Sequence, residues 1–256
     1  LVGAINKATA TVTFSTPLSV VYDATSRSVG TTTTPAALAV VVQYSGRGAT
    51  NFATSTTGPI DAGSYGVAAS INETNYLGTN AADFSIEKQV LPVALETAAL
   101  TTTFTGRARF VAATTMPLGK QVGVLYQGSG STTYAASTYA PTNAGTYAVT
   151  ATIEERNFQG TSTQTLTVAK ANQETLSIVN TAPVVYGDTT TSLLAKGGTG
   201  NGAITYVKVS GPCTIDSATG AVLTTGVGSC VVRASKAASD NVEAVVSANR
   251  TLEIVK

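Results

Sequence analysis

Residues 59–71 read PIDAGSYGVAASI, and the pattern returns at residues 141–153 as PTNAGTYAVTATI, 82 positions further along the chain. In each copy a turn of the form Pro-x-(Asp/Asn)-Ala-Gly leads into the alternation Tyr-x-Val-x-Ala-x-Ile. We expect Gly to supply a positive φ in this turn and the Asp or Asn side chain to hydrogen-bond nearby backbone. Because apolar residues then recur at every second position, each copy predicts one half-buried strand. We call residues 59–63 and 141–145 the corner turns.

Tyr65 and Tyr147 open the two alternating segments directly after the corner turns. In the immunoglobulin sandwich, a Tyr at the start of the penultimate strand bonds through its phenol to upstream backbone. We therefore predict that Tyr65 and Tyr147 form structural tyrosine corners. Residues 40–44 and 122–126 also alternate, and no apolar pattern of helical period of useful length occurs. The predicted fold class is all-β, with six or seven short strands in each immunoglobulin-like β-sandwich module.

Each repeat closes with an alternating segment that ends in Lys, at positions 7, 88, 170 and 256. These positions predict the tail of a preceding module (residues 1–7), module one (8–88), module two (89–170) and module three (171–256). At roughly 85 residues, each module exceeds the roughly 40-residue size below which a domain needs outside help. The connections contain no flexible spacer, so we expect three tandem modules in an elongated array on the order of 100 Å long. We interpret the chain as a piece of a longer exported protein.

The composition offers little for chemistry. Charged residues are 11% of the chain, against roughly 25% in ordinary soluble proteins. The net charge is +1 without a run of Lys or Arg, which argues against nucleic acid and anionic membrane surfaces as partners. The absence of His removes the commonest general base and metal ligand. We therefore predict no catalytic residue, no metal site, no cofactor and no membrane insertion, and we expect a protein that is not an enzyme.

Module three diverges from the other two. Residues 227–234 align with residues 144–151, which puts Cys230 where the corner Tyr stands in module two. Residues 213–223 predict a hairpin around a Ser-Ala-Thr-Gly turn. The cysteines do not form a Cys-x-x-Cys pair, and zinc would lack two ligands, so we prefer a Cys213–Cys230 disulfide over free thiols. Closing a loop of this length stabilises by about 3 kcal/mol in the chain-entropy model.

Several short motifs accompany the corner turns. They are YDAT at residues 22–25, Asn-(Tyr/Phe)-x-Gly at residues 75–78 and 157–160, and Lys-Ala at residues 170–171. Together with the corner turns they resemble the MBG-type repeats of large bacterial surface proteins, and module three resembles the Cys-containing immunoglobulin-like repeats that accompany them. Module two departs from the pattern at residues 104–107, which read FTGR, and its first hairpin is therefore less well defined. The resemblance implies an exported, adhesin-like architecture in which such modules usually act as stalk.

Carboxylates are the main candidates for chemistry or metal binding. Glu154 and Glu155 are neighbours on a strand, so their side chains point to opposite faces and cannot flank one bond as an acid/base pair. Asp23 and Asp61 could give oxygens to calcium, but calcium takes six to eight oxygens and no Asp-x-Asp-x-Asp-Gly run occurs. We keep interdomain calcium, and a covalent Lys–Asn cross-link, as minor alternatives.

Two Gly-rich loops, residues 45–48 and 127–130, could contact a ligand. The side chains that would do so are Arg47, Phe52, Tyr134 and Tyr139. The simpler interpretation, which we prefer, is a hairpin loop covered by an aromatic ring.

The predicted function is a structural stalk of an extracellular bacterial cell-surface adhesin, with neighbouring modules of the same chain as its partners. Two alternatives stay open: a module that binds a host or cell-surface glycan or protein, and an accessory region of a secreted polysaccharide-active enzyme. We expect a monomer.

Overall fold

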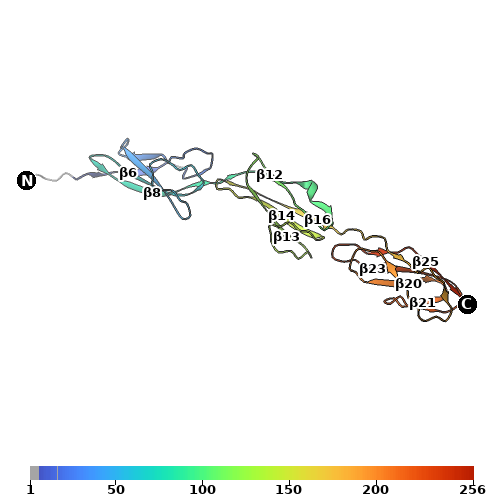
Figure 1. The fold of residues 1–256 in the computed structure, drawn as a ribbon. Helices are drawn as coiled ribbons and strands as arrows, with labels where there is room; N and C mark the ends of the chain where they lie inside the picture. Colours follow the sequence, from blue (N-terminus) through green and yellow to red (C-terminus); the bar gives the residue numbers. More distant parts are fainter. Residues whose placement is uncertain (1–5, 16) are drawn as a thin grey trace, which may run out of the picture. The chain divides into compact units, whose positions relative to one another are not determined.

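The computed structural model describes residues 6–15 and 17–256, and its elements are almost entirely β-strands (Figure 1). Within these residues the only helix is a 3₁₀ turn at Thr97–Ala99. Residues 1–5, which belong to the predicted tail of a preceding module, lie outside the described part. By the proximity of Cα atoms the chain divides into two compact units. The first comprises Leu1–Ala94, Ala113–Gly123 and Ala151–Ser162, and the second comprises Leu95–Ala112, Val124–Thr150 and Thr163–Lys256.

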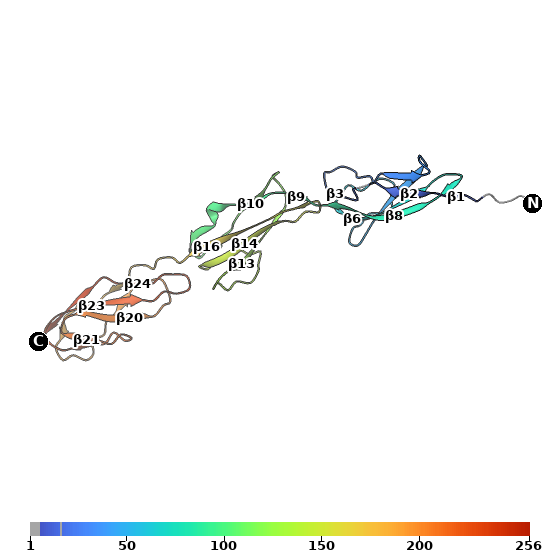
Figure 2. The same ribbon diagram turned by 180° about the vertical axis from the view of Figure 1, so that it is seen from behind.

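Module one, in the first unit, consists of two packed sheets. The larger has the strand order β3 (Ser19–Val21), β8 (Thr79–Glu87), β6 (Gly63–Ile71), β5 (Val40–Gly46). The smaller pairs β2 (Thr11–Phe14) with β4 (Thr31–Thr34) in antiparallel register. Figure 2 shows β6 beside β8 from behind. Alternation along β6 buries every second side chain from Tyr65 to Ala69, and the core further includes Tyr44, Phe84 and Ile86.

Short parallel pairs join the start of a module to the loop before its last strand. β1 (Ala8–Thr9) pairs with β7 (Tyr76–Leu77), and β9 (Gln89–Val90) pairs with β15 (Phe158–Gln159). β10 (Val93–Leu95) neighbours β12 (Ala113–Thr115).

The central sheet of module two has the strand order β11 (Thr101–Thr103), β16 (Thr161–Ala169), β14 (Gly145–Ile153), β13 (Val122–Gly128). The sequence departure at Phe104 leaves the backbone pairing intact. Its N–H donates to Ala169 O at 2.8 Å, just as the Tyr22 N–H donates to Glu87 O at 2.9 Å. Ladder bonds use backbone atoms, so this substitution does not disturb them.

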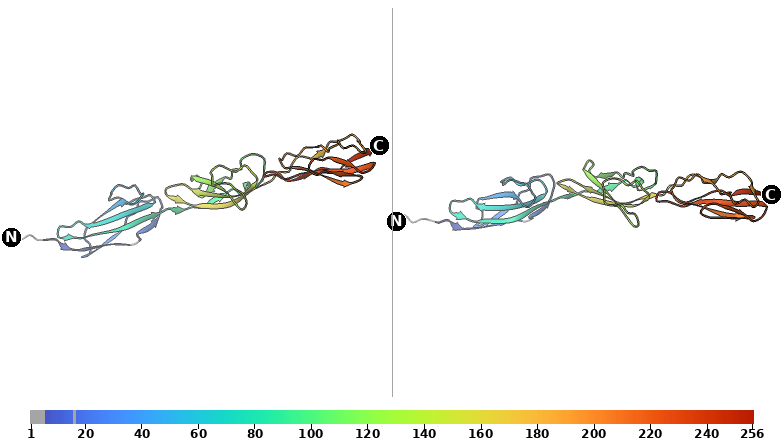
Figure 3. Two further views of the ribbon diagram at one scale, coloured as in Figure 1. Left: turned by 90° about the horizontal axis from the view of Figure 1, so that it is seen from below. Right: turned by 60° about the horizontal axis from the view of Figure 1, so that its bottom comes forward.

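Module three, in the second unit, is built around the strand order β18 (Val184–Val185), β25 (Arg250–Val255), β23 (Gly228–Lys236), β20 (Ile204–Ser210), with β24 (Val245–Val246) also on β23. These C-terminal strands appear orange to red in Figure 3. β17 (Ser177–Ile178) pairs with β19 (Ala195–Lys196). The predicted hairpin is confirmed as β21 (Cys213–Ile215) and β22 (Val222–Thr224) in antiparallel register.

The same strand relation recurs along the chain. An early strand of each module pairs in parallel with its last long strand, as β3 with β8, β11 with β16 and β18 with β25. This arrangement confirms the predicted fold class of tandem immunoglobulin-like β-sandwich modules.

Candidate functional site

Each corner Tyr is tied to its corner turn by one hydrogen bond. The Tyr65 hydroxyl donates to Asp61 O at 2.6 Å, and the Tyr147 hydroxyl donates to Asn143 O at 2.8 Å. Both residues are almost completely buried. Because burial disfavours the charged phenolate, it raises the pKa of both hydroxyls. Each hydroxyl is therefore a neutral donor that fastens the start of its strand to the turn before it.

Only one of the two corner-turn glycines has the predicted positive φ. Gly145 has a φ of 158°, close to extended backbone, whereas Gly63 is not among the glycines with positive φ. Close approach is a reason for glycine in both turns. A Cβ on Gly63 would lie 2.8 Å from the Thr50 side chain, and one on Gly145 would lie 2.7 Å from the Thr132 side chain. Each Thr is this close because its hydroxyl accepts, at 2.9 Å, the N–H that follows the glycine.

The acidic side chain of the first corner turn bonds to the next module rather than to the nearby backbone that we predicted. Asp61 Oδ1 accepts a hydrogen bond from Asn157 Nδ2 at 2.9 Å, and Asp61 Oδ2 lies 2.9 Å from Arg156 Nη1. Asn157 Oδ1 in turn accepts the Ala62 N–H at 2.8 Å. Asn157 therefore binds the corner turn through both ends of its amide, and all these residues belong to the first unit.

The second corner turn makes the equivalent contact within the second unit. Asn241 Oδ1 accepts the Ala144 N–H at 2.7 Å, and Asn241 Nδ2 donates to Asn143 Oδ1 at 3.2 Å. One arrangement thus recurs with different residues in both units. We call residues 155–160 and 239–243, which carry the two asparagines, the junction loops.

The closing lysines bind the same junction loops. Lys88 Nζ donates to Glu155 O at 2.9 Å, and Lys170 Nζ donates to Ser239 O at 2.7 Å. The backbone N–H after each Lys donates to the carbonyl of the junction-loop asparagine, at 3.0 Å in both cases. Each closing Lys is followed by its asparagine after a similar interval, from Lys88 to Asn157 and from Lys170 to Asn241. This recurrence is the sequence signal for a role that we had not assigned to either residue.

Close packing explains the rest of the Asn-(Tyr/Phe)-x-Gly motif. A Cβ on Gly160 would lie 2.2 Å from Leu91 O, so only glycine allows the backbone at Leu91 to approach this closely. The Phe158 ring meets the Tyr22 ring edge to face at 5.4 Å between centroids, and Lys120 Nζ lies 3.7 Å from its centre. Aromatic and cation–π contacts therefore add to the hydrogen bonds of the first junction loop.

Two of the four predicted ligand-loop residues pack inward onto the corner tyrosines. The Phe52 ring lies 5.5 Å from the Tyr65 ring, and the Tyr134 ring lies 5.5 Å from the Tyr147 ring, both edge to face. This geometry fits a hairpin loop covered by an aromatic ring.

The other two ligand-loop residues face outward. Arg47 pairs with Asp83 at 2.7 Å between two exposed side chains. Tyr139 is 81% exposed, and its carbonyl accepts the Tyr134 hydroxyl at 2.8 Å. The second unit thus brings Tyr134 and Tyr139 together, whereas Arg47 and Phe52 belong to the first unit.

A cleft of about 740 Å³ lies beside Tyr134 in the second unit. Its lining includes hydroxyl and amide groups and one charge of each sign, from Thr132, Thr142, Asn143, Lys170 and Asp240.

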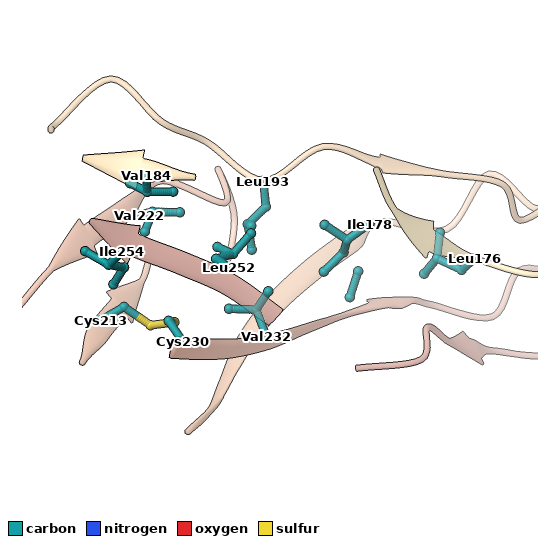
Figure 4. Close-up of a cluster of buried hydrophobic side chains, with 11 residues drawn as sticks. Leu176, Ile178, Val184, Leu193, Cys213, Val222, Cys230, Val232, Leu252 and Ile254 are labelled. Atoms are coloured by element: carbon teal, nitrogen blue, oxygen red, sulfur yellow. A yellow bond between two sulfur atoms is a disulfide. The ribbon is translucent and has the colours of Figure 1, made fainter. Parts of the chain in front are cut away.

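The predicted disulfide between Cys213 and Cys230 is present (Figure 4), with 6.0 Å between the Cα atoms and both residues fully buried. It lies in the core cluster of module three, which includes Val232, Leu252 and Ile254. Cys230 stands opposite Leu252 in the β23–β25 ladder, as Tyr65 stands opposite Phe84 in module one. The disulfide therefore occupies the position of the corner Tyr.

Three of the four carboxylates that we considered for calcium or acid/base work contact other protein groups, and one of them is Asp61 at the first junction loop. Asp23 accepts the hydroxyl and the N–H of Thr25 and pairs with Arg27, and the hydroxyl bond is the main cause that lowers its pKa. Glu155 accepts the Gln121 N–H at 2.8 Å. Across residues 6–15 and 17–256, no three His, Cys, Asp or Glu side chains gather as a metal site would require.

In the described residues, no helix has the length and apolar character for crossing a membrane.

Solved structures with some similarity to the chain have low identity. Three N-terminal domains of the bacteriophage RB49 outer capsid protein Hoc align at 15% identity, cover 96% of this chain and 100% of theirs, and give a TM-score of 0.34. Sidekick-1 immunoglobulin domains 1–5 align at 13% identity over 95% of this chain and 58% of theirs, with a TM-score of 0.38. Drosophila N-cadherin EC1–4 aligns at 10% identity over 96% and 75%, with a TM-score of 0.32. No curated protein matches the chain.

The profile of the MBG domain matches the sequence twice, at residues 10–90 and 93–172. The first match includes the corner turn of module one and Lys88. The second includes the corner turn and the junction loop of module two and Lys170. The chain therefore belongs to the MBG domain family.

Proposed function

We propose that the chain is a structural stalk of a bacterial cell-surface adhesin and holds a distal binding region away from the cell. The observation that carries the proposal is the pair of asparagine contacts, in which Asn157 and Asn241 each bind the corner turn of the preceding module. A spacer needs connections that resist bending, and these contacts add a second attachment beside the covalent link. The role involves no catalysis, and its partners are the neighbouring modules.

The module boundaries of this proposal are those predicted from the sequence, with modules at residues 8–88, 89–170 and 171–256. They receive support from the closing lysines, since Lys88 and Lys170 each bind the junction loop of the module that follows. A disulfide and a family of surface-protein repeats favour an extracellular location.

Small-angle scattering tests the stalk. We expect a monomer with a maximum dimension on the order of 100 Å, from modules of about 35 Å placed end to end. The double variant Asn157→Ala/Asn241→Ala removes the contacts at both junction loops, so we expect a broader distribution of distances with the same secondary structure by circular dichroism.

A matched control is Asn72→Ala/Asn249→Ala, which changes two exposed asparagines and leaves the contacts at the junction loops in place. This control should scatter like the unmodified chain. A compact particle, or a junction double variant that scatters like the control, would contradict the stalk.

A second function is favoured by the cleft beside Tyr134. Its hydroxyl, amide and charged groups suit a glycan, and the exposed Tyr139 is joined through its backbone carbonyl to Tyr134, which lines the cleft. A glycan array would favour this function over the stalk if binding were saturable and were lost in Tyr139→Ala.

A further inference from the structure

Module one carries a third loop of the same kind as the two junction loops. Residues 73–78 read ETNYLG, and they align with the junction loop of module two, where residues 155–160 read ERNFQG. In this loop Asn75 takes the position of Asn157 and Asn241. A Cβ on Gly78 would lie 2.1 Å from Ala10 O, which repeats the close approach at Gly160.

The segment that enters module one binds this loop as the other two connections bind theirs. Lys7 Nζ donates to Glu73 O at 2.7 Å, and the Ala8 N–H donates to Asn75 O at 2.8 Å. The backbone of Asn75 is thus held by the same contacts that hold Asn157 and Asn241.

The side chain of Asn75 differs from its two counterparts in what covers it. Asn157 and Asn241 are half-buried against corner turns, whereas Asn75 is exposed. Within residues 6–15 and 17–256, the Asn75 amide has no hydrogen-bond partner, although its backbone is positioned like theirs. An amide that binds a turn in two equivalent loops is presented to solvent in the third.

We propose that residues 73–78 together with Lys7 form a docking surface for the corner turn of a further MBG module, with the sequence (Asp/Asn)-Ala-Gly. Asn75 Oδ1 accepts the N–H of the Ala, and Asn75 Nδ2 donates to the Asp or Asn side chain. This proposal rests on the stalk function. It identifies the corner turn of another MBG module as the partner of this surface.

The residue before the asparagine indicates which corner turns fit. Arg156 faces the negative Asp61, whereas Asp240 precedes Asn241, which binds the neutral Asn143. Thr74 holds this position in module one and is neutral, so it accepts either side chain. The corner turn of module three has Gly226 where module two has Asn143, so it offers no side chain to Asn75.

The test places a corner turn in reach of Asn75. A second copy of residues 89–170 replaces residues 1–7, so that its closing Lys takes the position of Lys7. Amide hydrogen exchange by NMR then follows the N–H of the copied Ala144. We expect Asn75→Ala to speed this exchange about three- to tenfold, which is the effect of losing one hydrogen bond.

Two controls accompany this measurement. Asn72→Ala in the same extended chain changes an exposed asparagine outside the docking surface, and it should leave the exchange rate unchanged. A second extended chain with a copy of residues 8–88 at the same place carries an Asp corner turn, and it provides the same readout if the first copy does not fold.

The exchange of the Ala62 N–H separates this proposal from the stalk. Asn157→Ala should speed that exchange, because it removes the bond already present at 2.8 Å. If Asn157→Ala acts and Asn75→Ala does not, the docking surface is overturned and the stalk stands. If Asn157→Ala has no effect either, the junction contacts that carry the stalk fail as well.

Discussion

Tyr65 and Tyr44 occupy one core but use their hydroxyls in opposite senses. The Tyr65 hydroxyl donates to a carbonyl of the corner turn, whereas the Tyr44 hydroxyl accepts the buried Val29 N–H at 2.6 Å. Tyr126 repeats the second bond with the Val111 N–H at 3.0 Å. A buried N–H left without an acceptor costs more than the loss of the hydroxyl donor at a carbonyl of the corner turn.

This difference predicts a graded series of Tyr→Phe variants. Tyr65→Phe and Tyr147→Phe should each lower the free energy of unfolding by about 1 kcal/mol, and Tyr44→Phe by about 2 kcal/mol, because only the last leaves a buried donor unpaired. Tyr139→Phe is the control, since its side chain is exposed, and it should stay within about 0.5 kcal/mol of the unmodified chain. Urea unfolding followed by circular dichroism measures the series, and equal losses in all four variants would refute the argument.

Asp188 predicts how module three responds to acid. Its carboxylate accepts the hydroxyls of Thr191 and Thr190 and the Thr190 N–H, and these bonds lower its pKa from 3.8 to about 2. The unfolded chain binds the proton more readily, so the stabilisation is complete above about pH 4 and is lost as the pH falls through about 2.

We therefore expect the urea midpoint of module three to fall between pH 4 and pH 2. Asp188→Asn should lower the midpoint at pH 7 and remove this part of the acid dependence. Asp240→Asn changes an exposed carboxylate of the same module and serves as control. An Asp188→Asn chain with an unaltered pH profile would contradict the prediction.

In module three, which has no corner Tyr, a disulfide links the β21–β22 hairpin to β23. The disulfide joins β21 to β23 from within the core, and its two cysteines are 17 residues apart. It restricts the unfolded chain, while Tyr65 acts in the folded state through its hydrogen bond and its buried ring.

Removal of the disulfide should destabilise module three alone. Cys213→Ala/Cys230→Ala should lower its free energy of unfolding by about 3 kcal/mol, as expected for closure of a loop of this size. Module one should unfold at an unchanged urea concentration. Intact mass under denaturing conditions, before and after reduction, verifies the bond, and two thiols that alkylate freely in the native protein would disprove it.

For the molecule as a whole, the parallel terminal pairs determine how force acts on each module. β3 pairs in parallel with β8, and β18 pairs in parallel with β25. When the two ends of a module are pulled apart, these pairs are loaded in shear, and their backbone hydrogen bonds resist together.

Single-molecule stretching should therefore show three separate unfolding events. Modules one and two should each lengthen the chain by roughly 250 Å, and module three by roughly 50 Å less while its disulfide closes 17 residues. Reduction should make the three steps equal to within about 10%. Two large unequal steps would instead indicate that the two compact units unfold, and not three modules.

Much of the fold was predictable from the sequence because its signals are local. Two-residue alternation determines which side chains of β6 and β14 face the core, whatever the rest of the chain does. The corner-turn pattern recurs after 82 residues, and this interval predicted the repeating modules. The alignment of Cys230 with the corner Tyr predicted where the disulfide lies.

Only the tertiary structure decided what the corner turns and the Asn-(Tyr/Phe)-x-Gly motif contact. Asn157 meets Ala62 across 95 residues of sequence, and Gly63 is required by the side chain of Thr50 rather than by its own φ. Strand formation depends on backbone geometry and side-chain alternation within a few residues, which a sequence displays directly. Partners that lie far apart in the chain meet only after each sandwich has formed, so their contacts depend on packing that no short stretch contains.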